Sequence, residues 1–222
     1  LNMKNMIESE MVRALSKGEF VVYYQPKYEL ANDTIIGAEA LVRWNHKEKG
    51  IISPGVFIPV FERNGFIVDL DFYVYEQVLK MQKHRLDMGK KVIPISMNVS
   101  RCHLSDTNFV DKLEAVVAKY KVPKQYIEME ITESIFSQED SSAIALIYNL
   151  KEHGFTISMD DFGSAYSSLN LLRKVQIDTL KIDKVFIDST EDVQRSQVIV
   201  EEIINMASKI HVKTICEGVE TQ

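Results

Sequence analysis

The sequence predicts an α/β protein built as a (β/α) barrel whose first two strands form an antiparallel hairpin. Segments rich in β-formers alternate with helical segments over most of the chain, which is typical of parallel strands joined by right-handed crossovers. The first two strand-like segments are instead joined by a short turn, which favours antiparallel pairing. No glycine-rich phosphate turn follows an early strand, which disfavours a doubly wound dinucleotide-binding sheet.

The first elements follow from local patterns. Residues 2–17 place apolar side chains at three- and four-residue spacings, and Gly18 supplies a helix stop. Residues 20–25 and 34–44 are rich in β-formers, and Asn32-Asp33 between them has the composition of a turn. We therefore expect a helix followed by a hairpin.

Strands and helices alternate in the rest of the chain. Gly89 and Gly154 stand at the ends of helical segments, where a residue with positive φ commonly ends a helix. The expected strands are 92–99, 126–131, 155–160, 178–183 and 213–217. The expected helices are 70–88, 109–120, 141–152, 167–173 and 193–209. With the hairpin this makes seven strands, so we expect one domain over residues 1–222 that lacks the last βα unit of a barrel.

Composition limits the classes of function. The chain has 222 residues, 45% hydrophobic residues and a formal net charge of -6, which suits a globular domain and disfavours binding of a nucleic acid polymer. Two cysteines and the absence of a long apolar run indicate a reducing compartment and no membrane contact by this segment. The chain begins with Leu1, so we expect a cytoplasmic piece of a longer protein, which itself is either soluble or membrane-anchored.

Polar side chains interrupt the apolar strands near their carboxyl ends. In a barrel of parallel strands these ends meet at one face, where active sites lie. The residues concerned are Glu39, Asn98, Glu130, Asp160, Asp161, Lys181 and Glu217. Carboxylates that converge need neutralising cations, and an oxygen-only set favours Mg²⁺ or Mn²⁺ over Zn²⁺. The pattern therefore predicts a two-metal site that activates water against a phosphodiester.

Two basic residues fit the same chemistry. Lys181 would place a fixed cation near the attacking water or the phosphoryl oxygens. Period-two geometry puts Glu39, Leu41 and Arg43 on one face of a strand, where a guanidinium suits a bound phosphate.

Each of these residues also has a simpler interpretation. An acidic residue at a strand end usually serves a turn or a cap, and a single lysine usually reaches to solvent. The five histidines show no metal-ligand spacing, so we take His46, His84, His103, His153 and His211 as surface or structural residues. The two-metal hypothesis thus depends on the joint pattern.

The joint pattern resembles the EAL domain family. Glu39-Ala40-Leu41 gives that family its name, and the other matching strings follow in the family's order. They are 24–26 (Tyr-Gln-Pro), 37–44, 52–54, 57–59, 98–100 (Asn-Val-Ser), 130–134, 160–169 (beginning Asp-Asp-Phe-Gly), 181–183 and 217–220.

The resemblance implies a modified TIM barrel with an antiparallel first strand, and hydrolysis of cyclic di-GMP to linear pGpG. It implies metal ligation by Glu39, Asn98, Glu130 and Asp160 at one ion, and by Asp160, Asp161 and Glu217 at a second. Glu217 is alternatively the base, Lys181 orients the water, and Glu133 anchors the loop 161–168, which links metal binding to dimerisation. Gln25, Leu41 and Arg43 would contact the dinucleotide. The implied partners are a second copy of the domain and a sensor or diguanylate-cyclase-like domain in the parent chain.

The sequence departs from the family pattern in two ways. Ala165 stands where a glycine is usual, and no string matches the family's last strand. These departures motivate an alternative, a catalytically silent receptor for cyclic di-GMP. A third hypothesis is an unrelated metal-dependent barrel enzyme that acts on another phosphoester.

Overall fold

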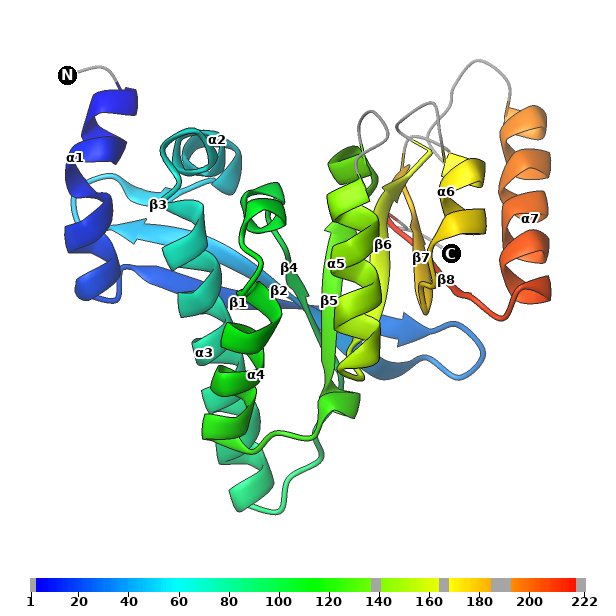
Figure 1. Cartoon of the computed structure of the whole chain (residues 1–222), viewed down its shortest axis with the longest axis horizontal. Coiled ribbons are helices and arrows are strands. Elements are labelled where there is room, and N and C mark those ends of the chain that lie inside the picture. The colour runs from blue at the N-terminus through cyan, green and yellow to red at the C-terminus, as the bar shows by residue number, and fades with distance from the viewer. Residues whose placement is uncertain (1–2, 137–140, 164–167, 185–192, 219–222) are drawn as a thin grey trace. The chain divides into compact units, whose positions relative to one another are not determined.

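The computed structural model describes residues 3–136, 141–163, 168–184 and 193–218. The chain forms two compact units, residues 1–127 and 128–222 (Figure 1). Ala165, which departs from the family pattern, lies outside the described residues.

The first unit contains the antiparallel hairpin and the first parallel strand. Its elements are α1 (Met3–Ser16), β1 (Phe20–Glu29), β2 (Thr34–His46), β3 (Gly50–Ile52), α2 (Pro54–Asn64), α3 (Ile67–Asp87), β4 (Ile95–Asn98), η1 (Arg101–Ser105), α4 (Phe109–Tyr120) and η2 (Lys124–Tyr126). Strand β2 pairs antiparallel with β1 and with β3, and parallel with β4. Figure 1 shows β1 and β2 as a long two-stranded ribbon, which confirms the predicted hairpin.

The hairpin turn is closed by its own side chains. Asn32 Oδ1 accepts hydrogen bonds from the backbone N–H of Thr34 at 3.2 Å and from its hydroxyl at 2.6 Å. Asp33 adopts a φ of 53°, a left-handed conformation that Asp tolerates better than most residues. Both features explain why Asn-Asp reads correctly as a turn.

An aromatic cluster forms the core of the first unit. Phe20 from β1 lies 5.1 Å from Trp44 of β2 and 5.7 Å from Phe57 of α2, measured between ring centroids. All three side chains are buried. Helix α2, which the sequence patterns did not predict, thus supplies one wall of this core. It begins with Pro54 and contains Pro59, and proline normally argues against a helix interior.

The second unit is a parallel β/α array. Its elements are β5 (Ile127–Thr132), η3 (Glu133–Phe136), α5 (Ser141–Glu152), β6 (Thr156–Phe162), α6 (Ser168–Lys174), β7 (Thr179–Ile182), α7 (Val193–Lys209) and β8 (Lys213–Cys216). Strands β5, β6, β7 and β8 pair in chain order and all in parallel. The predicted α/β class with an antiparallel first strand is therefore confirmed. Within the described ranges, no helix is long and apolar enough to cross a membrane.

Candidate active site

The side chain of Lys181 forms ion pairs with three carboxylates in the second unit. Its ammonium nitrogen lies 2.5 Å from Oε1 of Glu130, 3.0 Å from Oδ1 of Asp160 and 2.8 Å from Oε1 of Glu217. Lys181 lies on β7, Glu130 on β5 and Asp160 on β6, while Glu217 directly follows β8. The structure thus brings together side chains from four neighbouring parallel strands at their carboxyl ends, as the sequence pattern predicts.

A bulge in β6 places two consecutive aspartates opposite one lysine. Met159 pairs with Leu180 and Phe162 pairs with Ile182, so Asp160 and Asp161 together face Lys181 across the β6–β7 ladder. Asp161 has a φ of 55°, and its N–H donates to Oδ1 of Asp160 at 2.9 Å. In a regular strand neighbouring side chains point to opposite faces, but the bulge lets both carboxylates act at the same edge.

The cluster carries more negative than positive charge. Burial raises the pKa of Asp160, and the carboxylate of Glu130 raises it further, while Lys181 opposes both effects. Burial also raises the pKa of Asp161, with added repulsion from Asp160, Asp183 and Glu217. A hard divalent cation would relieve this repulsion, so the donor set fits Mg²⁺ or Mn²⁺. In the part of the chain that the structure describes, no three acidic, His or Cys side chains are arranged as metal ligands. The ammonium group of Lys181 is instead the cation that the carboxylates share.

Glu133 anchors the chain just after β6. Its Oε2 accepts a hydrogen bond from the backbone N–H of Gly163 at 2.8 Å, and its side chain is buried. Gly163 has a φ of 95°, which a residue with a Cβ would adopt only with strain. The expected role of Glu133 in the 161–168 segment stays a prediction, and residues 164–167 lie outside the described part.

The first unit carries a second group of candidate residues on one face of β2. Ala38, Ala40 and Trp44 are buried, whereas Glu39, Leu41 and Arg43 are only half-buried, so the alternation predicted for this strand is confirmed. The guanidinium of Arg43 donates to the carbonyl of Val42 at 2.9 Å.

The strands on either side of β2 extend this face. Gln25 of β1 is the register partner of Glu39, and it is exposed. Ser96 of β4 is the partner of Glu39 on the other side. Asn98 lies two residues beyond Ser96, on the same face, and is exposed.

Two buried serines near the acidic residues escaped the sequence analysis. Ser96 pairs in register with Glu39, and Ser158 of β6 pairs with Glu130. Their side chains are buried, and neither hydroxyl has a hydrogen-bond partner among the residues the structure describes. A small hydroxyl inside an otherwise apolar strand was the signal that could have found them.

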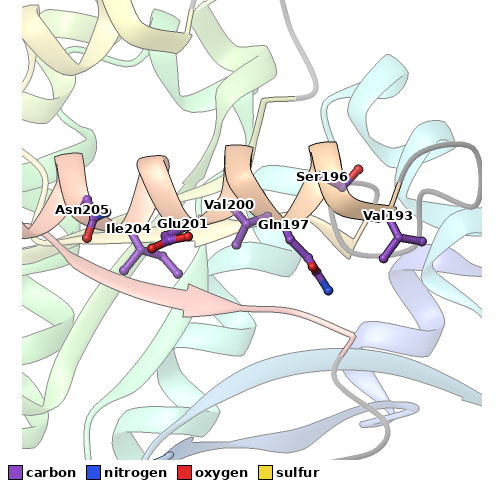
Figure 2. A pocket seen from close by; sticks show the side chains of 7 residues that line it. All are labelled: Val193, Ser196, Gln197, Val200, Glu201, Ile204 and Asn205. Atoms are coloured by element: carbon purple, nitrogen blue, oxygen red, sulfur yellow. The ribbon is translucent and has the colours of Figure 1, made fainter.

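A surface hollow on α7 lies apart from these groups. Its volume is about 350 Å³, and Figure 2 shows its lining side chains along α7. The lining residues are Val193, Ser196, Gln197, Val200, Glu201, Ile204 and Asn205. Glu201 is the one ionisable side chain among them, so the hollow lacks the converging acids and bases of a catalytic site.

Curated relatives match nearly the whole chain. The bifunctional diguanylate cyclase/cyclic di-GMP phosphodiesterase MucR of Pseudomonas aeruginosa is 32% identical over 213 residues, which are 96% of this chain and 31% of MucR. The cyclic di-GMP phosphodiesterase NbdA of the same organism is 34% identical over 215 residues, 97% of this chain and 28% of NbdA. The chain thus spans about a third of the length of these relatives.

The fold matches that of a solved relative, and the sequence matches a family. The structure of the PaMucR phosphodiesterase in complex with c-di-GMP superposes with a TM-score of 0.90 at 31% identity, over 98% of this chain and 88% of that one. The predicted modified TIM-barrel class is therefore confirmed at the level of fold. The sequence profile of the EAL domain matches residues 8–222, and the chain accordingly belongs to the EAL domain family.

Proposed function

We propose that this chain is a metal-dependent phosphodiesterase that opens one phosphodiester of cyclic di-GMP and releases linear pGpG. The observation that carries the proposal is the buried Lys181 among Glu130, Asp160 and Glu217, in a chain of the EAL family. Relatives at 32% and 34% identity are named as cyclic di-GMP phosphodiesterases, which supports the substrate.

The proposed metal ligands are Glu39, Asn98, Glu130, Asp160, Asp161 and Glu217. What supports this set is its match to the family strings and its oxygen-only chemistry. Two bound ions, Mg²⁺ or Mn²⁺, would polarise the phosphate and make water a better nucleophile at neutral pH.

The chain's own groups supply the proton transfer and the orientation. The ammonium of Lys181, held at 2.8 Å from Glu217, is placed to donate a hydrogen bond to the attacking water or to a phosphoryl oxygen. Glu217 is the most exposed of the three carboxylates, with 35% of its side chain accessible, so it is the one best placed to take the water's proton if it acts as the base instead of as a metal ligand. In the overall step a water oxygen bonds to phosphorus, one P–O ester bond breaks, and the departing oxygen gains a proton.

The proposed substrate contacts come from β1 and β2. Gln25 offers an amide that both donates and accepts hydrogen bonds, and Leu41 offers apolar surface to a base or ribose. Arg43 offers a planar guanidinium to a phosphate. Gln25 and Leu41 lie on the same face as Glu39, which supports one shared binding surface on the first unit.

The proposal extends to the other domains of the same protein and to its oligomeric state. Since the chain covers 31% of MucR, which is named as bifunctional, we propose that a sensor or cyclase-like domain belongs to the same protein. We further propose that the domain works as a homodimer in the cytoplasm, where a soluble nucleotide messenger acts.

Turnover in the intact protein tests the proposed function. Incubation with cyclic di-GMP and Mg²⁺ or Mn²⁺ is expected to yield linear dinucleotide, and EDTA is expected to abolish the reaction. Glu39→Ala should remove the activity, whereas Glu29→Ala, at an exposed position at the end of β1, should preserve it.

Three results would contradict the proposal. Binding of cyclic di-GMP without any product would indicate a silent receptor. Hydrolysis of other phosphoesters without preference for the cyclic dinucleotide would indicate an unrelated barrel enzyme. Full activity of Glu39→Ala would exclude the proposed metal site.

A further inference from the structure

Helix α3 carries a row of buried polar side chains that hold the main chain around β4. Asp71, Tyr75 and Gln82 recur at spacings of four and seven, so they lie on one face of the helix. Gln82 Nε2 donates to the carbonyl of Ile93 at 3.3 Å and to that of Tyr126 at 2.7 Å, which fixes the approach to β4.

The other two residues of the row, Tyr75 and Asp71, form hydrogen bonds with the main chain at the carboxyl end of β4 and just after it. The hydroxyl of Tyr75 donates to the carbonyl of Asn98 at 2.9 Å. One turn earlier on α3, Oδ2 of Asp71 accepts the backbone N–H of Ser100 at 3.3 Å. The bond from Tyr75 fixes the peptide plane that directly follows Asn98, and the bond to Asp71 fixes the next peptide plane, between residues 99 and 100.

His103 completes the network from the following η1 helix. Its Nε2 lies 2.9 Å from Oδ2 of Asp71, and the side chain is 1% exposed. The ring centroid lies 4.1 Å from that of Phe109, and the ring of Phe72 meets the imidazole edge-on at 83°. His103 is thus locked in orientation by two rings, which confirms a structural position for this histidine.

The charges of this network are set by burial and hydrogen bonding. Burial raises the pKa of Asp71, while the hydrogen bonds from His103 and Ser100 lower it. Oδ2 of Asp71 accepts the backbone N–H of Ser100 and lies within hydrogen-bond distance of Nε2 of His103, to which the Nε2–H tautomer of the imidazole would donate. Nδ1 of His103 has no hydrogen-bond partner within the described ranges, and a bare ring nitrogen there costs less than an unpaired N–H.

A buried polar network of this kind is a poor device for stability alone. Apolar side chains of similar volume often stabilise a core as well or better, so a retained polar network calls for another reason. Here the main-chain hydrogen bonds of Tyr75 and Asp71 both reach one short segment, residues 98–100, at the carboxyl end of a strand.

We propose that Asp71, Tyr75 and His103 are positioning residues that set the direction of the Asn98 side chain for metal ligation. The inference rests on the proposed function, in which Asn98 is one of the metal ligands. Removing a residue that holds a metal ligand in place by hydrogen bonding commonly weakens metal affinity by about 10- to 100-fold.

Tyr73 of the same helix offers a matched control. Its hydroxyl also donates to a backbone carbonyl, that of Phe20 at 3.0 Å, but at the start of β1. Tyr75→Phe and Tyr73→Phe therefore each delete one hydroxyl and one hydrogen bond from α3, and the bond at Asn98 is lost in the first variant alone.

Mn²⁺ affinity measured by calorimetry on the intact protein, without nucleotide, tests the proposal. Tyr75→Phe is expected to weaken Mn²⁺ binding about tenfold, and Tyr73→Phe by less than about twofold. In an Asn98→Ala background, Tyr75→Phe is expected to have no further effect on Mn²⁺ affinity, because its influence passes through the side chain that is already absent. Asp71→Asn provides a second variant if Tyr75→Phe does not fold.

The outcomes separate this proposal from the proposed function. Equal Mn²⁺ affinities of Tyr75→Phe and Tyr73→Phe, in an enzyme that turns over cyclic di-GMP, would overturn the positioning role alone. Additive losses in the Asn98→Ala background would overturn it as well, since Tyr75 would then act elsewhere. A wild-type protein that neither binds Mn²⁺ nor hydrolyses cyclic di-GMP would refute both.

Discussion

The ammonium nitrogen of Lys181 lies 2.5 Å from Oε1 of Glu130, and their side chains are only 2% and 0% exposed. Removing water from two charges is costly, and the attraction between them must offset that cost. Asp160 and Glu217 add negative charge around the same ammonium, so Lys181 neutralises a group of acids. This relationship ties the stability of the second unit to the chemistry proposed for it.

Substitution of Lys181 by Met tests this coupling. Removing the ammonium leaves buried carboxylates uncompensated, so the metal-free protein is expected to lose about 3 kcal/mol of unfolding free energy. Turnover of cyclic di-GMP is expected to fall by about 100-fold or more, because a fixed cation at the reacting phosphate is lost. Calorimetric unfolding with and without Mn²⁺ is the measurement, and added Mn²⁺ should restore part of the stability.

Lys83→Met is the matched control for that substitution. Lys83 pairs with Asp87 one turn along α3 at an exposed position, where an ion pair contributes little. Wild-type turnover in Lys181→Met would contradict the role assigned to the buried ammonium.

Replacement of Asp161 by Gly should separate stability from activity. Glycine adopts the φ of 55° without strain, which offsets its larger loss of chain entropy, so stability should change by less than about 1 kcal/mol. Activity should fall strongly, because a proposed metal ligand is lost. Asp33→Gly, at a φ of 53° in the hairpin turn, is the control. In thermal unfolding its stability should change as little as that of Asp161→Gly, but it should keep full turnover. An active Asp161→Gly enzyme would remove Asp161 from the ligand set.

Replacement of Glu133 by Ala should loosen the segment that follows β6. The N–H of Gly163 loses its acceptor, which is expected to cost about 1–3 kcal/mol of stability. The expected kinetic result is a lower kcat that excess Mn²⁺ does not restore, since Glu133 acts through the chain and not as a metal ligand. Steady-state kinetics at saturating metal measure this, with Glu152→Ala at the exposed end of α5 as control. Unchanged kcat in Glu133→Ala would argue against the anchor.

The acid sensitivity of the first unit should depend on Glu19. Its carboxylate accepts bonds from Arg13 at 2.5 and 3.2 Å and from the indole N–H of Trp44 at 3.1 Å. The bond from Arg13 is the main cause that lowers the pKa of Glu19, and the bond from Trp44 adds to it. A lowered folded-state pKa means that the stabilisation is present above the usual value of 4.5 and is lost as pH falls through the folded-state value.

Glu19→Gln should therefore lower the melting temperature at pH 7, and the difference from wild type should shrink as the solution is acidified below pH 4.5. Thermal unfolding over a pH series measures this. Glu8→Gln is the control, since Glu8 meets Lys4 at 3.8 Å on the exposed side of α1 and should matter little. A constant difference across the pH series would contradict the assignment.

Local sequence patterns predicted most of the helices and strands, because the formation of these elements depends largely on residues that are close together in the chain. The hairpin follows from two β-rich runs around Asn32-Asp33, and α1 follows from its three- and four-residue periodicity. Helix α2 was missed since Pro54 and Pro59 mask it, and only its packing against Phe20 and Trp44 makes a helix favourable there.

The sequence by itself determined the types and order of the candidate residues, because acids, an amide and a lysine in apolar strands stand out without any fold. The tertiary structure decided which charges meet. It joined Lys181 to three acids from other strands, and the β6 bulge set Asp160 and Asp161 together opposite Lys181 in the β6–β7 ladder. It also placed Asp71 against the backbone N–H of Ser100, two residues after Asn98, and His103 against Asp71. These relationships depend on strand register and burial between residues far apart in the chain, which no local pattern encodes.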